Sequence, residues 1–80
     1  MIDLFISKTC PYCQKVMDFM KGHNMECNIV DVSDEDNVLK LLTLGGKDQV
    51  PFLYDSENDE RIYESDIIIE YLKDRLNYAK

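Results

Sequence analysis

The first 22 residues change abruptly from a strand pattern to a helix pattern, and this change limits the folds open to the chain. Residues 1–7 alternate and are rich in β-formers, which predicts a strand. Residues 11–21 repeat apolar side chains at helical spacing, begin at Pro11 and run to Gly22, which predicts a helix. A strand that leads directly into a helix indicates the first half of a β-α-β unit.

The rest of the chain alternates strand and helix patterns in the same way. Three further strands are predicted, over residues 25–32, 50–55 and 61–64. Only the turn sequence SENDE separates the last two, so they predict a hairpin. One parallel crossover followed by a hairpin implies an α/β fold of order β-α-β-α-β-β-α, with a mixed four-stranded sheet flanked by helices.

Two more helices complete this order. Ser33 and Ser65 are their predicted N-caps, and Gly45 and Gly46 are predicted to end the first of them. Their buried stripes are expected at Val38, Leu39, Leu41 and Leu42, and at Ile68, Ile69, Tyr71, Leu72 and Leu76.

Size and charge limit the partners. Eighty residues make one small domain with one core. Residues 1–25 carry three lysines against two aspartates (+1), whereas the remainder carries six bases against fourteen acids (−8). An acidic body repels phosphate and anionic lipid, so we expect neither nucleic acid nor a membrane as a partner. No apolar run has membrane-spanning length and no signal peptide is recognisable, so we expect a cytoplasmic monomer.

Two cysteines lie at the predicted start of the first helix, where Cys10 and Cys13 flank Pro11 and Tyr12. The unpaired backbone N–H groups of the first turn and the positive end of the helix dipole would stabilise a Cys10 thiolate, and Lys8 would add a positive charge. Because the thiolate is the form that attacks disulfides, Cys10 is the predicted nucleophile. Cys13, one turn further on with its sulfur turned inward, is the predicted resolving thiol and would form a redox-active disulfide with Cys10.

Two other interpretations of the pair are open at this point: two inert thiols, or half of a zinc site. His23 and Cys27 would complete the spacing C-x2-C-x9-H-x3-C, and structural zinc takes four ligands. However, Cys27 falls in the predicted strand 25–32, where a small buried residue is expected, and His23 follows a glycine in a turn. We favour redox chemistry, with no metal and no bound cofactor.

The chain resembles the dithiol glutaredoxins. The resemblance is carried by CPYC at 10–13, QVPFLY at 49–54 and YESDIIIEYL at 63–72, in that order over essentially the whole chain. It implies a single glutaredoxin-like domain, residues 1–80, with a thioredoxin fold. It also implies glutathione-dependent reduction of protein disulfides and glutathionylated proteins, with glutathione as a co-substrate.

The same resemblance implies a set of glutathione-binding residues. Pro51 would be a cis proline facing the cysteines, and the Val50 backbone would pair with the cysteinyl part of glutathione. Ser65 and Asp66 would meet the γ-glutamyl group, since a helix N-terminus binds carboxylates and an aspartate pairs with an ammonium. The alternative is that Ser65 only caps the helix and Asp66 only complements its dipole. Lys8, Tyr12 and Glu64 complete the set.

The chain departs from the glutaredoxin pattern in two places. Ser7 stands three residues before the first cysteine, where glutaredoxins usually carry a lysine or arginine, and Lys8 comes one residue later. Glu64 and Ser65 replace the glycine pair that precedes the last helix, and this Glu-Ser step resembles the glutathione-binding half of glutathione transferases.

These departures leave the reductant open. One alternative is a redoxin that thioredoxin reductase recharges and that donates electrons to enzymes such as ribonucleotide reductase. Another low-molecular-weight thiol is a further option. An alternative of another class is a non-catalytic module that binds glutathione or a protein.

Overall fold

The computed structural model describes the backbone of residues 1–78 and the side chains of residues 1–76. The elements are β1 (Ile2–Ile6), α1 (Pro11–Gly22), β2 (Asn28–Asp31), α2 (Glu35–Gly45), β3 (Phe52–Asp55), β4 (Glu60–Tyr63) and α3 (Ser65–Tyr78). This is the predicted order β-α-β-α-β-β-α. No helix within residues 1–78 has the length and apolar character needed to span a membrane.

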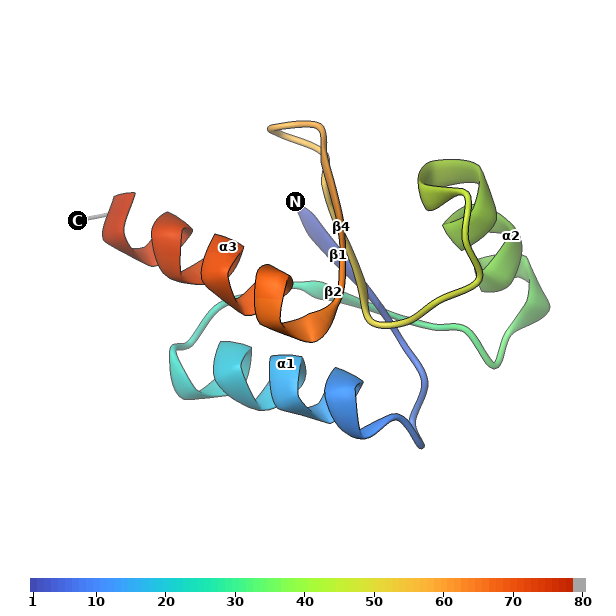
Figure 1. The fold of residues 1–80 in the computed structure, drawn as a ribbon, viewed down its shortest axis with the longest axis horizontal. Helices are drawn as coiled ribbons and strands as arrows, with labels where there is room; N and C mark the ends of the chain where they lie inside the picture. The colour runs from blue at the N-terminus through green and yellow to red at the C-terminus, as the bar shows by residue number, and fades with distance from the viewer. Residues whose placement is uncertain (79–80) are drawn as a thin grey trace.

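The four strands form one mixed sheet in the order β2-β1-β3-β4. β1 pairs in parallel with β2 and antiparallel with β3, which pairs antiparallel with β4. Helices α1 and α3 cover one face of the sheet, and α2 lies on the other (Figure 1). The predicted mixed four-stranded sheet flanked by helices is therefore confirmed.

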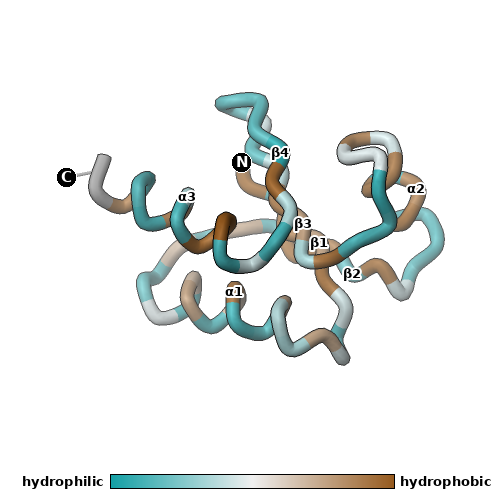
Figure 2. Tube along the Cα trace, in the orientation of Figure 1, coloured by the Kyte–Doolittle hydropathy of each residue, from teal (hydrophilic) through white to brown (hydrophobic). Residues whose placement is uncertain are grey.

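The apolar core has one part on each face of the sheet. Successive residues of a strand point to opposite faces, so Leu4 and Phe5 belong to different parts. The larger part, under α1 and α3, consists of Ile2, Leu4, Ile6, Cys13, Val16, Met20, Leu53, Ile68 and Leu72. The smaller part, under α2, consists of Phe5, Leu41 and Phe52. The hydrophobic segments of the trace concentrate accordingly at the central strands β1 and β3 (Figure 2).

The predicted stripe of α2 was partly wrong. Leu41 is buried, but Leu39 and Leu42 are 62% and 40% exposed. Leu41 and Leu44 are the residues that pack towards the sheet, and Val38 lies half-buried. At about 100° per residue, Leu39 and Leu42 lie well off this line of contact. Because α2 alone covers its face, no second helix shields them.

Two predicted N-caps were also wrong. Asp34, not Ser33, caps α2, since its Oδ1 accepts the Asp36 N–H at 3.0 Å. Ser65 is the first residue of α3, and the Glu64 carbonyl accepts the first helical hydrogen bond from Ile68 at 3.0 Å. Glu64 itself has a positive φ of 73°, which turns the chain from β4 into the helix.

Two further local expectations change. Cys27 precedes β2 instead of lying within it, and it is half-buried. Gly22 is the last residue of α1, and Asn24 adopts the left-handed conformation after it, with φ of 53°. Asparagine tolerates this conformation better than most residues, so the glycine is not needed there. At the end of α2, Gly46 does take the expected left-handed cap, with φ of 82°.

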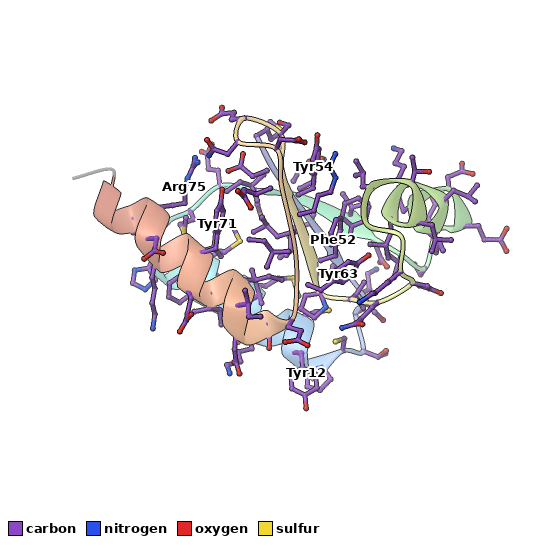
Figure 3. All side chains as sticks on the ribbon, turned by 45° about the horizontal axis from the view of Figure 1, so that its top comes forward. Tyr12, Phe52, Tyr54, Tyr63, Tyr71 and Arg75 are labelled. Atoms are coloured by element: carbon purple, nitrogen blue, oxygen red, sulfur yellow. The ribbon has the colours of Figure 1, made fainter. Side chains whose placement is uncertain are left out.

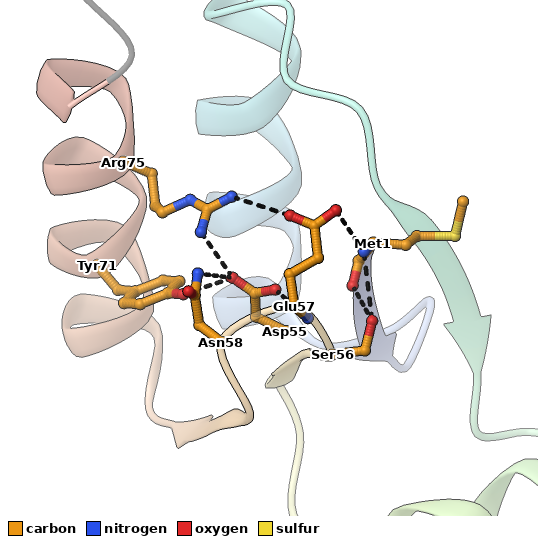
Figure 4. A network of polar contacts seen from close by, with 7 residues as sticks. All are labelled: Met1, Asp55, Ser56, Glu57, Asn58, Tyr71 and Arg75. Carbon is orange, nitrogen blue, oxygen red and sulfur yellow. Dashed lines mark hydrogen bonds and ion pairs between the residues drawn. The ribbon is translucent and has the colours of Figure 1, made fainter.

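A buried carboxylate ties the C-terminal part of α3 to the hairpin. Figure 3 shows Tyr71 and Arg75 on the side of α3 that faces β3 and β4. Asp55, at the end of β3, is 0% exposed, and its Oδ2 accepts from the Tyr71 hydroxyl at 2.5 Å, Asn58 at 3.1 Å and Arg75 at 3.1 Å (Figure 4). Its Oδ1 accepts the Glu57 N–H at 3.1 Å. The buried carboxylate thus accepts four hydrogen bonds, three on Oδ2 and one on Oδ1.

The hydrogen bonds set the charge state of Asp55. Burial raises its pKa, but the bonds from Tyr71, Asn58 and Glu57 and the charge of Arg75 outweigh burial, so the net pKa is lowered. A lowered native pKa stabilises the fold above the ordinary aspartate pKa of about 3.9. This contribution is lost as the pH falls through the still lower pKa of the folded state.

We expect Tyr71→Phe to lower the free energy of unfolding by about 1.5–3 kcal/mol at neutral pH, because a hydrogen bond to a buried charge is lost. Urea unfolding followed by circular dichroism measures this. The loss should shrink in acid, as Asp55 becomes protonated. Tyr54→Phe is the matched control, since Tyr54 lies on the same hairpin with its ring against Arg61. Equal losses in the two variants would contradict the role given to Asp55.

Candidate functional site

The two cysteines of the CPYC motif lie where β1 leads into α1. Cys10 is the N-cap of α1, with extended backbone (φ −90°, ψ 114°), and Pro11 occupies the first helical turn. The Cys10 sulfur accepts the backbone N–H of Cys13 at 3.3 Å. This is the arrangement expected for a sulfur that replaces the usual oxygen of an N-cap side chain.

Hydrogen bonds control the ionisation of Cys10. Partial burial raises its pKa, but the hydrogen bonds from Cys13 and from the Tyr12 N–H outweigh burial, so the net pKa is lowered. These donors are held in place by the first turn of α1 and favour the thiolate over the thiol. The predicted lowering of the Cys10 pKa is therefore present, and it comes first from the Cys13 side chain and then from the backbone N–H groups at the helix start.

Cys13 has the opposite character. Its side chain is 0% exposed within the larger core part. Burial, as the main cause, and the neighbouring Cys10 together raise the pKa of its thiol to about 12, although a hydrogen bond with the Ser7 backbone acts in the opposite direction. One helical turn thus carries two thiols with opposite pKa shifts, since its surroundings favour ionisation of Cys10 and oppose ionisation of Cys13. Both are free thiols here.

Lys8 lies apart from this arrangement. Its side chain is 83% exposed, and its ammonium pairs with Asp31 at 3.7 Å. The Ser33 hydrogen bonds are the main cause of the lowered pKa of Asp31, and Lys8 adds to it. Hydrogen bonds from the Cys13 side chain and from the backbone N–H groups of Cys13 and Tyr12, rather than Lys8, account for the lowered pKa of Cys10.

A cavity of about 280 Å³ adjoins the cysteine turn through Tyr12. Its lining consists of Tyr12, Gln49, Val50, Pro51, Glu64, Ser65 and Asp66. Apart from Lys8, this set contains every residue that the resemblance implied for glutathione, and the Val50–Pro51 peptide bond is cis, as was also implied. Gln49 is the one lining residue that was not proposed, although it precedes Val50 in the quoted QVPFLY segment.

Ser65 and Asp66 form the wall of the cavity at the start of α3. Ser65 is buried, and it is the first residue of α3, so the cavity lies at the N-terminal end of this helix. Asp66 is exposed, and its carboxylate pairs with Lys15 of α1 at 2.8 Å. The hydrogen bond and charge of Lys15 lower the pKa of Asp66. Lys15 is a second residue that sequence reasoning missed, since nothing local marks its partner 51 positions away.

The zinc alternative receives no support. α1 is about 18 Å long, and His23 follows its last residue, whereas Cys10 precedes its first. His23 packs on the Phe19 ring at 4.4 Å between centroids. Burial is the main cause of the raised pKa of Cys27, and Asp3 adds to it. Within residues 1–78, no three His, Cys, Asp or Glu side chains are grouped as a metal site would need.

Comparison with solved structures shows a thioredoxin-like fold. A mutant of the thioredoxin-like protein BC3987 is 25% identical with a TM-score of 0.79, over 95% of this chain and 99% of that one. A glutathione S-transferase from Methylobacillus flagellatus, with glutathione bound, is 27% identical with a TM-score of 0.70. The chain matches over 90% of its own length but only 35% of the transferase.

Glutaredoxin 2 from Salmonella typhimurium, in complex with glutathione, has the same fold. It is 22% identical with a TM-score of 0.76, over 90% of this chain and 32% of that one. A comparison with curated proteins gives no match. The model of one protein family, described as the glutathione S-transferase N-terminal domain, matches residues 4–78. With this match over nearly its whole length, and with a thioredoxin-like fold, the chain belongs to the glutathione S-transferase N-terminal domain family.

Proposed function

We propose that the protein is a glutathione-dependent thiol-disulfide oxidoreductase that reduces protein disulfides or glutathione mixed disulfides through Cys10 and Cys13. The observation that carries this proposal is the Cys10 sulfur, which accepts an N–H of the first turn of α1 beside the cavity. A structural thiol needs neither a lowered pKa nor access to a cavity. A nucleophilic thiol needs both.

The first step is an exchange of sulfur–sulfur bonds. The Cys10 thiolate attacks one sulfur of the substrate disulfide, and a bond forms between them as the substrate S–S bond breaks. The leaving sulfur departs as a thiolate and takes a proton from water. Cys10 is then held in a mixed disulfide, and no net oxidation has occurred.

The second step releases Cys10, and two thiols compete for it. Cys13 can attack the Cys10 sulfur and close the intramolecular disulfide, which a low-molecular-weight thiol then reduces. However, its pKa of about 12 keeps Cys13 almost entirely protonated at neutral pH. The Cys10 charge that helps raise this pKa is absent in the mixed disulfide, but burial remains the main cause. A glutathione thiolate from solution therefore competes well with Cys13.

The cavity offers partners for the cysteinyl and γ-glutamyl parts of a bound glutathione. The Val50 backbone would pair with the cysteinyl unit, as an added strand does. The α-carboxylate of the γ-glutamyl unit would lie at the N-terminus of α3 near Ser65, and its ammonium would lie at Asp66. Lys8 would have to leave Asp31 to contact the glycyl carboxylate.

One specific observation favours a second candidate, a redoxin recharged by thioredoxin reductase. Both charged side chains that would hold the ends of glutathione already have partners within the chain, since Lys8 pairs with Asp31 and Asp66 pairs with Lys15. The chemistry at Cys10 is the same in this candidate, and only the reductant differs.

We expect alkylation of Cys10 by iodoacetamide to reach half its maximal rate at a pH below about 8.5, the pKa of an unperturbed cysteine. The reason is the stabilised thiolate, which is the reacting species. Mass spectrometry of the labelled peptides follows each cysteine separately, so Cys13 and Cys27 act as internal controls that react only at higher pH. A midpoint for Cys10 at or above that of Cys27 would contradict the catalytic proposal.

Turnover of hydroxyethyl disulfide should occur with glutathione, NADPH and glutathione reductase. We measure NADPH consumption, and in parallel we replace glutathione and its reductase by thioredoxin reductase. Cys10→Ser is the inactive control. Turnover only with thioredoxin reductase would overturn the glutathione dependence and support the second candidate. Turnover in neither assay would favour a non-catalytic binding module.

We expect Cys13→Ser to retain most of the activity towards a glutathionylated peptide, because glutathione in solution can resolve the mixed disulfide. The backbone N–H that binds the Cys10 sulfur is unchanged in this variant. Reduction of a protein disulfide should fall, since the protein would stay attached to Cys10 for longer. Loss of both activities, with Cys10 still reactive in the alkylation assay, would show that Cys13 resolves every substrate.

A further inference from the structure

The cavity beside Cys10 has two walls that come from different parts of the chain. Gln49 and Val50 lie in the connection between α2 and β3, and Glu64, Ser65 and Asp66 lie at the start of α3. The connection, residues 46–51, belongs to no helix or strand, and residues 46–49 are exposed. Sheet pairing therefore cannot fix its distance from α3, and some other contact is needed to hold it.

Tyr63 makes this contact. It is the last residue of β4, immediately before the wall at Glu64, and its hydroxyl reaches Lys47 in the connection that carries the other wall. The hydroxyl donates to the Lys47 carbonyl at 2.8 Å and accepts the Lys47 N–H at 3.1 Å. One side chain thus satisfies both backbone groups of a residue that no strand pairs, three positions before Val50.

The ring of Tyr63 is held from several sides. It packs on the buried Phe52 ring with 4.6 Å between centroids, and the Lys47 ammonium lies 5.7 Å from its centroid. Phe52 is the cross-strand partner of Tyr63 in the hairpin. A rigid ring on a paired strand is a firm support for a flexible connection, because an aromatic side chain has few rotamers.

Gly45 makes room for the hydroxyl. A Cβ at this position would collide with the Tyr63 hydroxyl, and the ring carbon next to it would be only 2.8 Å away. Gly45 lies within α2, where alanine would be more favourable by helix propensity alone. Gly45 is therefore required by the close approach of the Tyr63 hydroxyl. The helical conformation at position 45 does not by itself require a glycine.

We propose that Tyr63 is a positioning residue for the glutathione site: its hydroxyl fixes the Gln49–Val50 wall at the distance from Ser65 that a bound glutathione spans. This inference rests on the proposed function. Tyr63 is not itself a lining residue of the cavity, and its hydroxyl binds the Lys47 backbone, so it acts through Lys47 and not on the reacting sulfurs. Its loss should weaken recognition of glutathione and leave the reactivity of Cys10 unchanged.

The test compares two disulfides on the full chain carrying Cys13→Ser. Stopped-flow kinetics give the second-order rate constant of Cys10 with glutathione disulfide and with hydroxyethyl disulfide, which lacks the γ-glutamyl and glycyl groups. Mass spectrometry confirms that the mixed disulfide forms on Cys10. The ratio of the two rate constants is the glutathione selectivity. The variants are Tyr63→Phe, with Tyr54→Phe as its control, and Gly45→Ala, with Gly22→Ala as its control, since a Cβ at Gly22 meets nothing within 4 Å.

Tyr63→Phe should lower the selectivity about tenfold, the effect of losing the two hydrogen bonds of the hydroxyl. The rate with hydroxyethyl disulfide and the pH midpoint of Cys10 should not change. Gly45→Ala should also lower the selectivity, because the added methyl group displaces the Tyr63 hydroxyl without removing it. Both control variants should keep the selectivity of the parent.

Equal selectivity in Tyr63→Phe and Tyr54→Phe would overturn the inference and leave the proposed function intact. A parallel loss with both disulfides would overturn it too, since that is the mark of a merely structural role. If Tyr63→Phe does not fold, the Gly45→Ala variant tests the inference. Unchanged selectivity in Gly45→Ala would then overturn it. A parent protein with no selectivity would overturn the glutathione site itself, and the role of Tyr63 with it.

Discussion

Helices α1 and α3 pack side by side on one face of the sheet, and this shared packing is the constraint on which the rest of the site depends. Val16, Met20, Ile68 and Leu72 are all buried in the same core part. As a result the first turns of the two helices lie close enough for Lys15 to reach Asp66 at 2.8 Å. A helix N-terminus that stabilises a thiolate is thus next to one suited to a carboxylate. The glutathione site proposed above would need both helix starts.

The Asp55 network holds the other end of this helix pair. α3 is anchored near its C-terminal half by Tyr71 and Arg75, and the anchor lies on the hairpin that also carries Tyr63. The same short hairpin therefore orients α3 through Asp55 and supports the α2–β3 connection through Tyr63. Because the core of this chain is small, polar contacts of this kind fix the positions of its elements. In larger domains, additional apolar layers have this effect.

What could be predicted from the sequence was the part that local rules determine. Pro11 after a cysteine, the alternation of short strands with helices, and the left-handed Gly46 each depend on a few neighbouring residues, and each is found as expected. Prediction failed where the choice depends on tertiary packing. Asp34 and Ser33 are equally good caps in isolation, and Leu39 and Leu41 are equally apolar. Only the position of α2 on the sheet distinguishes them.

The candidate site divides in the same way. Its lining could be proposed from motifs because those residues lie in three short segments, at Tyr12, around Pro51 and around Ser65. The ion-pair partners of its charged side chains could not be proposed in this way. Lys8 is adjacent to the cysteines in sequence yet pairs with Asp31, and Lys15 pairs with a residue on another helix. For this reason the lowered pKa of Cys10 depends on neutral hydrogen-bond donors, the Cys13 side chain and the backbone N–H groups of Cys13 and Tyr12, whose effect is short-ranged and little screened by salt.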